Sequence, residues 1–384
     1  MEARVLTKLG EHDKPTAIDL FAGAGGLSFG FFLAGFRLLQ AVEMDPNPAR
    51  TYGYNHPETD LISTDITALD PSECLERISL AEGELGCLIG GPPCQGFSES
   101  NRRTRSIDNP KNRLFTQFFR FLRVMQPQAF VIENVAGIKT LASGSILDEI
   151  ISEGEACDYR VEPILLNAID HGVPQLRRRF FVVGIRQGLG KFTSPPPSHG
   201  HSLKPCVTVS EAISDLPELD SGAAIDWLAY PSVGKLSAYQ RLMRRGTRDM
   251  VQGNLVTRNS PLILKRYAKI RPGQNWEAIP VKLMDNYQDR SRCHTGIYHR
   301  LDSACASKVI GNFRKNMLIH PAQHRGLSIR EAARLQSFPD RYVFLGSIGF
   351  QQQQVGDAVP PLLAQAVANM VKTILTQEPT RRTR

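Results

Sequence analysis

The sequence predicts an α/β fold, in which a sheet carries helices on both faces, followed by a smaller, mostly irregular or β domain. Apolar runs of strand length alternate with helical patterns through the first half of the chain. A glycine-rich turn at 22–26 separates the first run from the first helix, and three prolines at 195–197 end the alternation. The predicted strands cover 16–21, 37–42, 85–89, 129–132, 159–166 and 180–185, and the predicted helices cover 27–34, 114–124, 209–216, 327–336 and 360–375.

Length and composition fit a protein with more than one core. The chain has 384 residues, of which 41% are apolar and 22% are charged, as in ordinary soluble proteins. The best candidate for a membrane span, residues 27–36, is short and ends at Arg37, and the first residues show no signal-peptide pattern. We therefore expect a cytoplasmic protein that does not enter a membrane.

The cysteines predict a reducing compartment and no metal site. Their number, seven, is odd, and they form neither a disulfide framework nor a Cys-x-x-Cys pair. Cys293, His294 and Cys305 lack the second close pair that a structural zinc site needs.

The net charge of +8 is concentrated in one segment. Residues 235–271 contain ten Lys or Arg and a single acid, Asp249, so the segment carries +9 and the rest of the chain −1. Such a segment suits a polyanion, above all a nucleic acid, although an isolated basic run is often only a solvated face. Arg258, Asn259 and Gln274 are candidates for reading bases.

The first strand, the glycine turn and the first helix have the pattern of a nucleotide-type site. This arrangement lets a backbone approach a cofactor closely. Gly23 and Gly25 fit the dinucleotide spacing, but Ser28 stands where a third glycine is usual. The turn alone is also compatible with a nicotinamide dehydrogenase.

The next two strand ends carry acids beside apolar residues. Glu43 follows the strand at 37–42 and comes 20 residues after Gly23, the separation at which an acid can hold ribose hydroxyls. Asp65 and Ile66 suit an adenine amino group and ring face. Each acid alone is usually a helix cap or turn former, but the succession indicates an adenosine-containing cofactor.

Two further strands end in side chains that fit covalent chemistry. The strand at 85–89 leads through a Gly-Gly-Pro-Pro turn to Cys94, a thiol that its surroundings could activate. The strand at 129–132 ends at Glu133, which in a parallel sheet would lie at the same edge as Cys94. A Pro/Gly turn that happens to contain one of seven cysteines explains the first pattern equally well.

Basic residues accompany both of these strand ends. A polar loop at 99–113 contains five Lys or Arg and could close over a phosphate backbone. Gln175, Arg177 and Arg179 precede the last predicted strand. Alternation places these three on one face, which could grip a phosphate or a base edge.

Six motifs, in this order, resemble the carbon-5 cytosine DNA methyltransferase family. They are the glycine turn at 19–26, the Pro-Pro-Cys loop at 91–98, Glu-Asn-Val at 133–135, Gln-x-Arg-x-Arg at 175–179, a late helix at 330–339 and Gly-Asp-Ala-Val-Pro-Pro at 356–361. The chain departs from the family at Asp357, where Asn is common, and at 306–308, where Pro-x-Thr is usual.

This resemblance implies a Rossmann-like methyltransferase sheet that binds S-adenosylmethionine. Residues 1–192 would form the first part of the catalytic domain, 193–325 a target-recognition domain that binds DNA, and 326–384 a segment that returns to the catalytic domain. The implied cofactor-binding residues are Asp19, Phe21, Gly23, Gly25, Gly26, Glu43, Met44, Asp65, Ile66, Pro92, Leu114 and Asp357.

The resemblance also implies how a cytosine in double-stranded DNA is methylated at C5. Cys94 would add to C6 and make C5 nucleophilic, while Glu133 protonates N3. Arg179 would hold the cytosine O2, and Arg177 would contact phosphate or orient its neighbours. The base must first be flipped out of the duplex, because stacking and pairing hide C6 and N3.

The short chain without appended modules fits a bacterial or phage modification enzyme that acts as a monomer, with a cognate restriction endonuclease as a functional partner. An RNA cytosine-5 methyltransferase and a non-catalytic DNA-binding relative are the alternatives. The large basic insert argues against the first, and the presence of both Cys94 and Glu133 argues against the second.

Overall fold

A seven-stranded sheet forms the centre of the computed structural model, which describes residues 14–92, 114–135, 145–190, 192–287, 296–315 and 317–376. The strand order is β3-β2-β1-β4-β5-β7-β6, and β7 runs antiparallel to the other six strands. The strands are β1 (Thr16–Leu20), β2 (Arg37–Val42), β3 (Asp60–Ile62), β4 (Cys87–Gly90), β5 (Ala129–Val135), β6 (Tyr159–Asn167) and β7 (Arg178–Arg186). The α/β prediction is confirmed, and the predicted strands match within a few residues.

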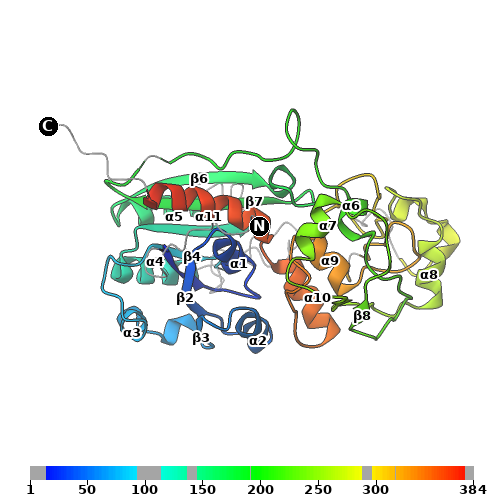
Figure 1. Cartoon of the computed structure of the whole chain (residues 1–384), viewed down its shortest axis with the longest axis horizontal. Coiled ribbons are helices and arrows are strands. Elements are labelled where there is room, and N and C mark those ends of the chain that lie inside the picture. The colour runs from blue at the N-terminus through cyan, green and yellow to red at the C-terminus, as the bar shows by residue number, and fades with distance from the viewer. Residues whose placement is uncertain are drawn as a thin grey trace, which may run out of the picture.

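Helices cover both faces of the sheet, as Figure 1 shows. They are α1 (Gly26–Leu33), α2 (Pro46–Asn55), α3 (Pro71–Arg77), α4 (Leu114–Met125), α5 (Ser145–Glu155) and α11 (Pro361–Thr376). The central strands are apolar on both sides because each side meets helices. In β4, Ile89 faces the core under α1 and α11, whereas Leu88 faces the core under α3, α4 and α5.

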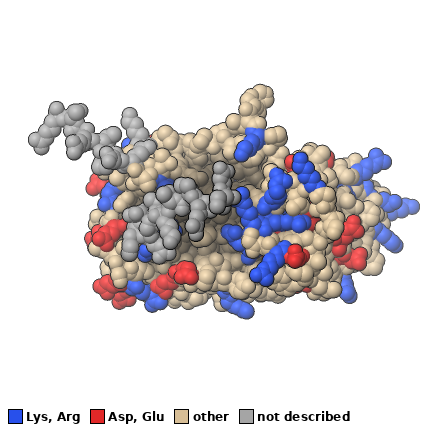
Figure 2. Space-filling model, in the orientation of Figure 1, with Lys and Arg blue, Asp and Glu red and all other residues tan. Residues whose placement is uncertain are grey.

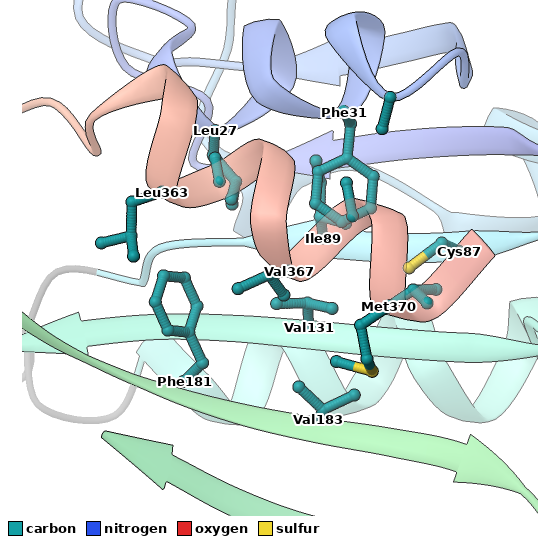
Figure 3. Packing of buried hydrophobic residues seen from close by; sticks show 14 of the residues in the cluster. Leu27, Phe31, Cys87, Ile89, Val131, Phe181, Val183, Leu363, Val367 and Met370 are labelled. Carbon is teal, nitrogen blue, oxygen red and sulfur yellow. The ribbon is translucent and has the colours of Figure 1, made fainter. Parts of the chain in front are cut away.

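The first and last of these helices pack directly on each other and on the sheet. Phe31 of α1 and Val367 of α11 lie in one cluster with Val131 of β5 (Figure 3). The contact is close because α1 has a glycine, Gly30, opposite α11. A Cβ at Gly30 would lie 2.7 Å from the backbone nitrogen of Gln365 and in hard contact with Ala364 Cβ.

Gly30→Ala is therefore expected to destabilise the fold, by about 1–3 kcal/mol, because the added methyl overpacks this interface. Gly53→Ala is a matched control within α2, where a Cβ meets only Leu61 at an ordinary 3.5 Å. That variant should instead gain up to about 1 kcal/mol from helix propensity. Urea unfolding of both variants checks the pair, and equal effects would contradict the close packing of α1 on α11.

A second lobe follows the prolines at 195–197. Its elements are α6 (Val209–Ile213), β8 (Leu228–Ala229), α7 (Ala238–Met243), β9 (Met250–Val251), α8 (Pro261–Tyr267), α9 (Ile329–Leu335) and α10 (Ile348–Asp357), with short 3₁₀ turns at Trp276–Ala278 and Val281–Leu283. The helix α9 shares its core with α6 and α7, and α10 lies at the junction of the two lobes (Figure 1). After residue 326 the chain therefore first forms α9 and α10, and it packs on the sheet again only at α11.

The segment Ile348–Thr376 has a mean hydropathy of 1.3 over its most apolar window and is long enough to cross a membrane. The expectation that residues 27–36 are the best candidate for a membrane span is wrong. Its second part, α11, buries Leu363, Val367 and Val371 against the sheet. Its apolar character is that of a core helix.

The basic segment 235–271 belongs to the second lobe, where many Lys and Arg side chains lie on the face shown in Figure 2. Eight of its ten basic residues are exposed. The other two have structural roles: Arg244 pairs with Asp215 at 2.6 Å, and buried Arg266 donates to the Leu283 carbonyl. The exposed charge available to a polyanion is therefore smaller than the sequence count.

Candidate active site

A cavity of about 630 Å³ lies at the carboxyl ends of β1, β2, β4 and β5, and α10 closes its far side. This is the sheet edge at which the sequence places its acids. Of the predicted site residues, the lining includes Asp19, Phe21, Gly23, Gly26, Glu43, Met44, Asp65, Ile66, Leu114, Glu133 and Asp357. Gly25 and Pro92 are described but do not line the cavity.

The glycine turn has the backbone that a close approach requires. Phe21 and Gly23 both have positive φ, 64° and 55°, and both line the cavity. Gly25, with φ of 87°, instead faces away, and a Cβ there would lie 2.6 Å from the Tyr342 hydroxyl. The role of Gly25 is thus to turn the chain into α1, for which it is the N-cap.

The two acids that follow β2 and β3 differ in their surroundings. Glu43 accepts hydrogen bonds from the backbone amides of Gly23 at 2.8 Å and Asp45 at 2.7 Å. Burial nevertheless raises the pKa of Glu43. Asp65 is exposed and caps a 3₁₀ turn through Thr67 N, and this bond lowers the pKa of Asp65. Glu43 therefore ties the glycine turn to β2, while Asp65 is open to a ligand.

Asp19 is a buried carboxylate behind the glycine turn. One oxygen, Oδ2, accepts from the Ser28 hydroxyl at 2.6 Å, and Ser28 also contacts the Tyr52 hydroxyl at 2.9 Å. The other oxygen, Oδ1, has no hydrogen-bond partner among the described residues. Burial raises the pKa of Asp19 to about 7, against the opposing Ser28 hydrogen bond. Ser28, at the third glycine position, thus completes a polar pair with Asp19.

Asp19→Asn is expected to change the pH dependence of stability. Because the pKa of Asp19 is higher in the folded chain than in the unfolded one, the folded state binds the extra proton. Stability is then lost as pH rises from about 4 through about 7. The Asn variant does not titrate there. The difference in free energy of unfolding, variant minus parent, should therefore be larger at pH 8 than at pH 5. Denaturant unfolding at both pH values measures this, and a constant difference would contradict it.

Glu133 and Arg179 form an ion pair beside the cavity. The distance from Glu133 Oε1 to Arg179 Nε is 2.8 Å, and the two side chains are 14% and 13% exposed. The antiparallel direction of β7 makes this contact, because it sets Arg179 opposite Val135 at the end of β5. Burial raises the pKa of Glu133, although Arg179 and Arg177 oppose the shift.

Arg177 and Gln175 are buried and do not present a phosphate-binding face. Arg177 donates to the carbonyls of Ile310, Gly356 and Ala358 at 2.9–3.2 Å. Gln175 donates to the Leu335 carbonyl and to Gln336. These contacts do not support a phosphate-gripping face at Gln175 and Arg177, and for Arg177 they fit the alternative that it orients its neighbours.

Asp357 lines the cavity. The carbonyls of the residues on either side of it, Gly356 and Ala358, accept hydrogen bonds from Arg177. Burial raises the pKa of Asp357, and Arg177 opposes the shift. Phe350, Gln353 and Gln354 of α10 also line the cavity. No sequence pattern indicated these three residues, because they lie more than 300 positions from the glycine turn and belong to no motif.

The predicted nucleophile, Cys94, lies outside the described residues, together with the basic loop at 99–113. The chain that leads to it is described as far as Pro92. Gly91 lines the cavity, and a Cβ on Gly91 would lie 3.3 Å from Glu133 Oε2. The approach to Cys94 therefore passes beside Glu133.

Comparisons with known proteins show the family to which the chain belongs. The family model of C-5 cytosine-specific DNA methylase matches residues 16–373. The chain is 37% identical to the Type II methyltransferase M.DdeI of Desulfomicrobium norvegicum, over 92% of this chain and 88% of that protein. It is 38% identical to M1.HphI of Haemophilus parahaemolyticus, over 94% and 88%.

Among solved structures, a candidate DNA modification methyltransferase encoded within an E. coli prophage superposes with a TM-score of 0.76. It is 27% identical, and the match covers 95% of this chain and all of that one. The sheet order, the cavity and the paired Glu133 and Arg179 thus occur in a chain that the family model matches almost throughout. The chain belongs to the C-5 cytosine-specific DNA methylase family and is a DNA cytosine-5 methyltransferase.

Proposed function

We propose that this enzyme methylates C5 of a flipped-out cytosine in a specific site of double-stranded DNA, with S-adenosylmethionine as the methyl donor and Cys94 as the covalent nucleophile. The observation that carries the proposal is the largely buried Glu133–Arg179 pair beside the cavity, next to the strand end that leads to Cys94.

The residues of the cavity fit S-adenosylmethionine. Its volume of about 630 Å³ is in the range of cofactor sites. The partnerless Asp19 Oδ1 is a buried acceptor that suits a cationic group, and Glu43 and Asp65 suit the ribose and the adenine amino group. Phe21, Met44, Ile66 and Leu114 would supply apolar contact. When bound, the cofactor supplies a methyl group on a positively charged sulfur.

The protein residues would prepare the cytosine for methylation. Addition of the Cys94 thiolate to C6 breaks the conjugation of the ring and makes C5 nucleophilic. Glu133, whose pKa burial raises, would donate a proton to N3 and make C6 more electrophilic. Arg179, which holds Glu133 at 2.8 Å, would also hold the cytosine O2. Arg177 would keep Asp357 in place through the adjacent carbonyls.

The exposed basic residues of 235–271 would contact the DNA phosphates and offset the cost of base flipping, which is about a few kcal/mol. Residues 193–325 would select the target sequence. We further propose that the enzyme acts as a monomer in the bacterial cytoplasm, with a cognate restriction endonuclease as its functional partner.

The proposed function is tested by expressing the chain in a host without cytosine methylation and mapping 5-methylcytosine by bisulfite sequencing. We expect methylation at one short recurring sequence. Methyl transfer to tRNA but not to duplex DNA, in an assay with labelled cofactor, would contradict the proposal.

Cys94→Ala is expected to abolish methyl transfer, because it removes the thiol that adds to C6. With S-adenosylmethionine present, a duplex with 5-fluorocytosine at the target site should trap the parent enzyme as a covalent adduct. Fluorine replaces the C5 hydrogen that must leave as a proton before the Cys94 sulfur can depart. The variant should form no adduct in denaturing electrophoresis. Cys305→Ala, at an exposed thiol, is the matched control and should be trapped like the parent. An adduct with Cys94→Ala would show that another residue is the nucleophile.

A further inference from the structure

A second cavity, of about 470 Å³, lies between the two lobes and shares no lining residue with the cofactor cavity. Its walls come from α11 and the 3₁₀ turn η6 (Ala168–His171) on the sheet side. From the second lobe come α7 and the crossover segment of residues 193–208. The mechanism proposed above uses none of these walls.

His171 is a buried imidazole in the wall of this cavity. It is 8% exposed and forms no side-chain hydrogen bond within the part of the chain that the structure describes. The ring of His199 lies next to it, packed on Gly172, where a Cβ would be 2.7 Å from His199 Cε1. Gly172 has φ of 81°, so the backbone turn admits the second imidazole.

The crossover segment is fixed in this position by main-chain bonds. The amides of Ser198 and His199 donate to the Asp170 carbonyl at 2.8 and 3.0 Å. His199 also pairs with Lys204 in an isolated β-bridge, which brings Lys204 to the same wall. The arrangement therefore holds three nitrogen-bearing side chains around one cavity.

The described lining contains no Asp or Glu. Its ionisable groups are His171, His199, Lys204 and the phenol of Tyr239, which already donates to the Arg334 carbonyl. Gln365 and Asn369 of α11 add neutral polar groups. Burial lowers the pKa of both histidines, and the nearby Asp170 opposes the shift for His171. A negatively charged ligand would favour their protonated forms.

We propose that this cavity is a binding site for a phosphate group, which His171, His199 and Lys204 hold between the two lobes. Phosphate suits a set of nitrogen donors without a competing carboxylate. Because the walls belong to both lobes, the bound anion would fix their relative position. The proposal does not depend on the methylation mechanism.

Inorganic phosphate is the probe, and the ring signals of the nine histidines in ¹⁵N-histidine-labelled enzyme are the readout. We expect the His171 and His199 signals to shift saturably with phosphate and their titration midpoints to rise. His171→Gln should weaken binding at least about tenfold. His201→Gln, at an exposed histidine outside the cavity, should leave binding unchanged.

Lys204→Met is a second variant at an exposed position, so it should fold and also weaken phosphate binding. The proposal would be overturned by signal shifts that do not saturate with phosphate or that chloride reproduces. Shifts that persist in both His171→Gln and Lys204→Met would also overturn it. A duplex oligonucleotide added to the phosphate complex distinguishes the source of the group. Displacement of phosphate assigns the site to the DNA backbone, and retention assigns it to a small phosphorylated molecule.

Discussion

Glu133→Gln is expected to lower kcat of methyl transfer roughly 100- to 10,000-fold, the usual contribution of a positioned general acid. Glutamine keeps the shape of the side chain beside Arg179 but cannot deliver a proton to N3. The parent enzyme should lose kcat as pH rises above the raised pKa of Glu133, and the variant should lack this dependence. Single-turnover methylation of a duplex substrate between about pH 5.5 and 9 measures both effects.

Glu153→Gln is the matched control for this experiment. Glu153 lies on α5 in a surface ion pair with Arg123 and is 36% exposed. Its replacement should leave kcat and the pH profile unchanged. If Glu133→Gln behaves in the same way, then the general-acid role is wrong and the pair with Arg179 is structural only.

Arg334→Met should have the largest effect on stability. Arg334 is fully buried and donates to Asp340 at 2.6 and 2.8 Å, to the Ala212 carbonyl at 2.9 Å and to Asp215. Removing the guanidinium leaves two buried carboxylates short of a partner, which costs about 3–5 kcal/mol. Thermal and denaturant unfolding should show this loss as a lower melting temperature and a lower unfolding midpoint.

An exposed ion pair provides the comparison for Arg334. Arg77 pairs with Asp60 near β3, and its side chain is 60% exposed. Arg77→Met should change the melting temperature only slightly, because solvent screens the pair. Equal losses in both variants would mean that the buried network around Arg334 is not what holds α6, α7 and α9 together.

Most of the fold could be predicted because its strands and helices have strong local patterns. The prediction of a strand at 37–42 coincides with β2, and the helix predicted at 327–336 is found as α9, which Ser328 caps. The direction of β7 could not be predicted, because an apolar run has the same composition in either direction. That direction decides whether Arg179 reaches Glu133 or lies at the opposite edge of the sheet.

The position of a residue in the wall of the cavity was predictable where one strand end supplies one residue, as at Glu43 and Asp65. The contacts of a site residue were not predictable where they depend on its burial. Alternation places Arg177 and Arg179 alike, yet only Arg177 is enclosed by the backbone around Ile310 and Gly356. That enclosure depends on segments that lie far away in the sequence, and so no local pattern records it.

The packing of α11 on α1 has a consequence for synthesis of the enzyme on the ribosome. The glycine turn and α1 emerge among the first residues, but their cover, α11, and the α10 wall of the cavity emerge among the last. Chain segments of such high separation pair late in folding. A nascent chain that stops before α10 would lack one wall of the cavity in which we propose that the methyl donor binds. We therefore expect such a truncated product neither to bind the donor nor to modify DNA.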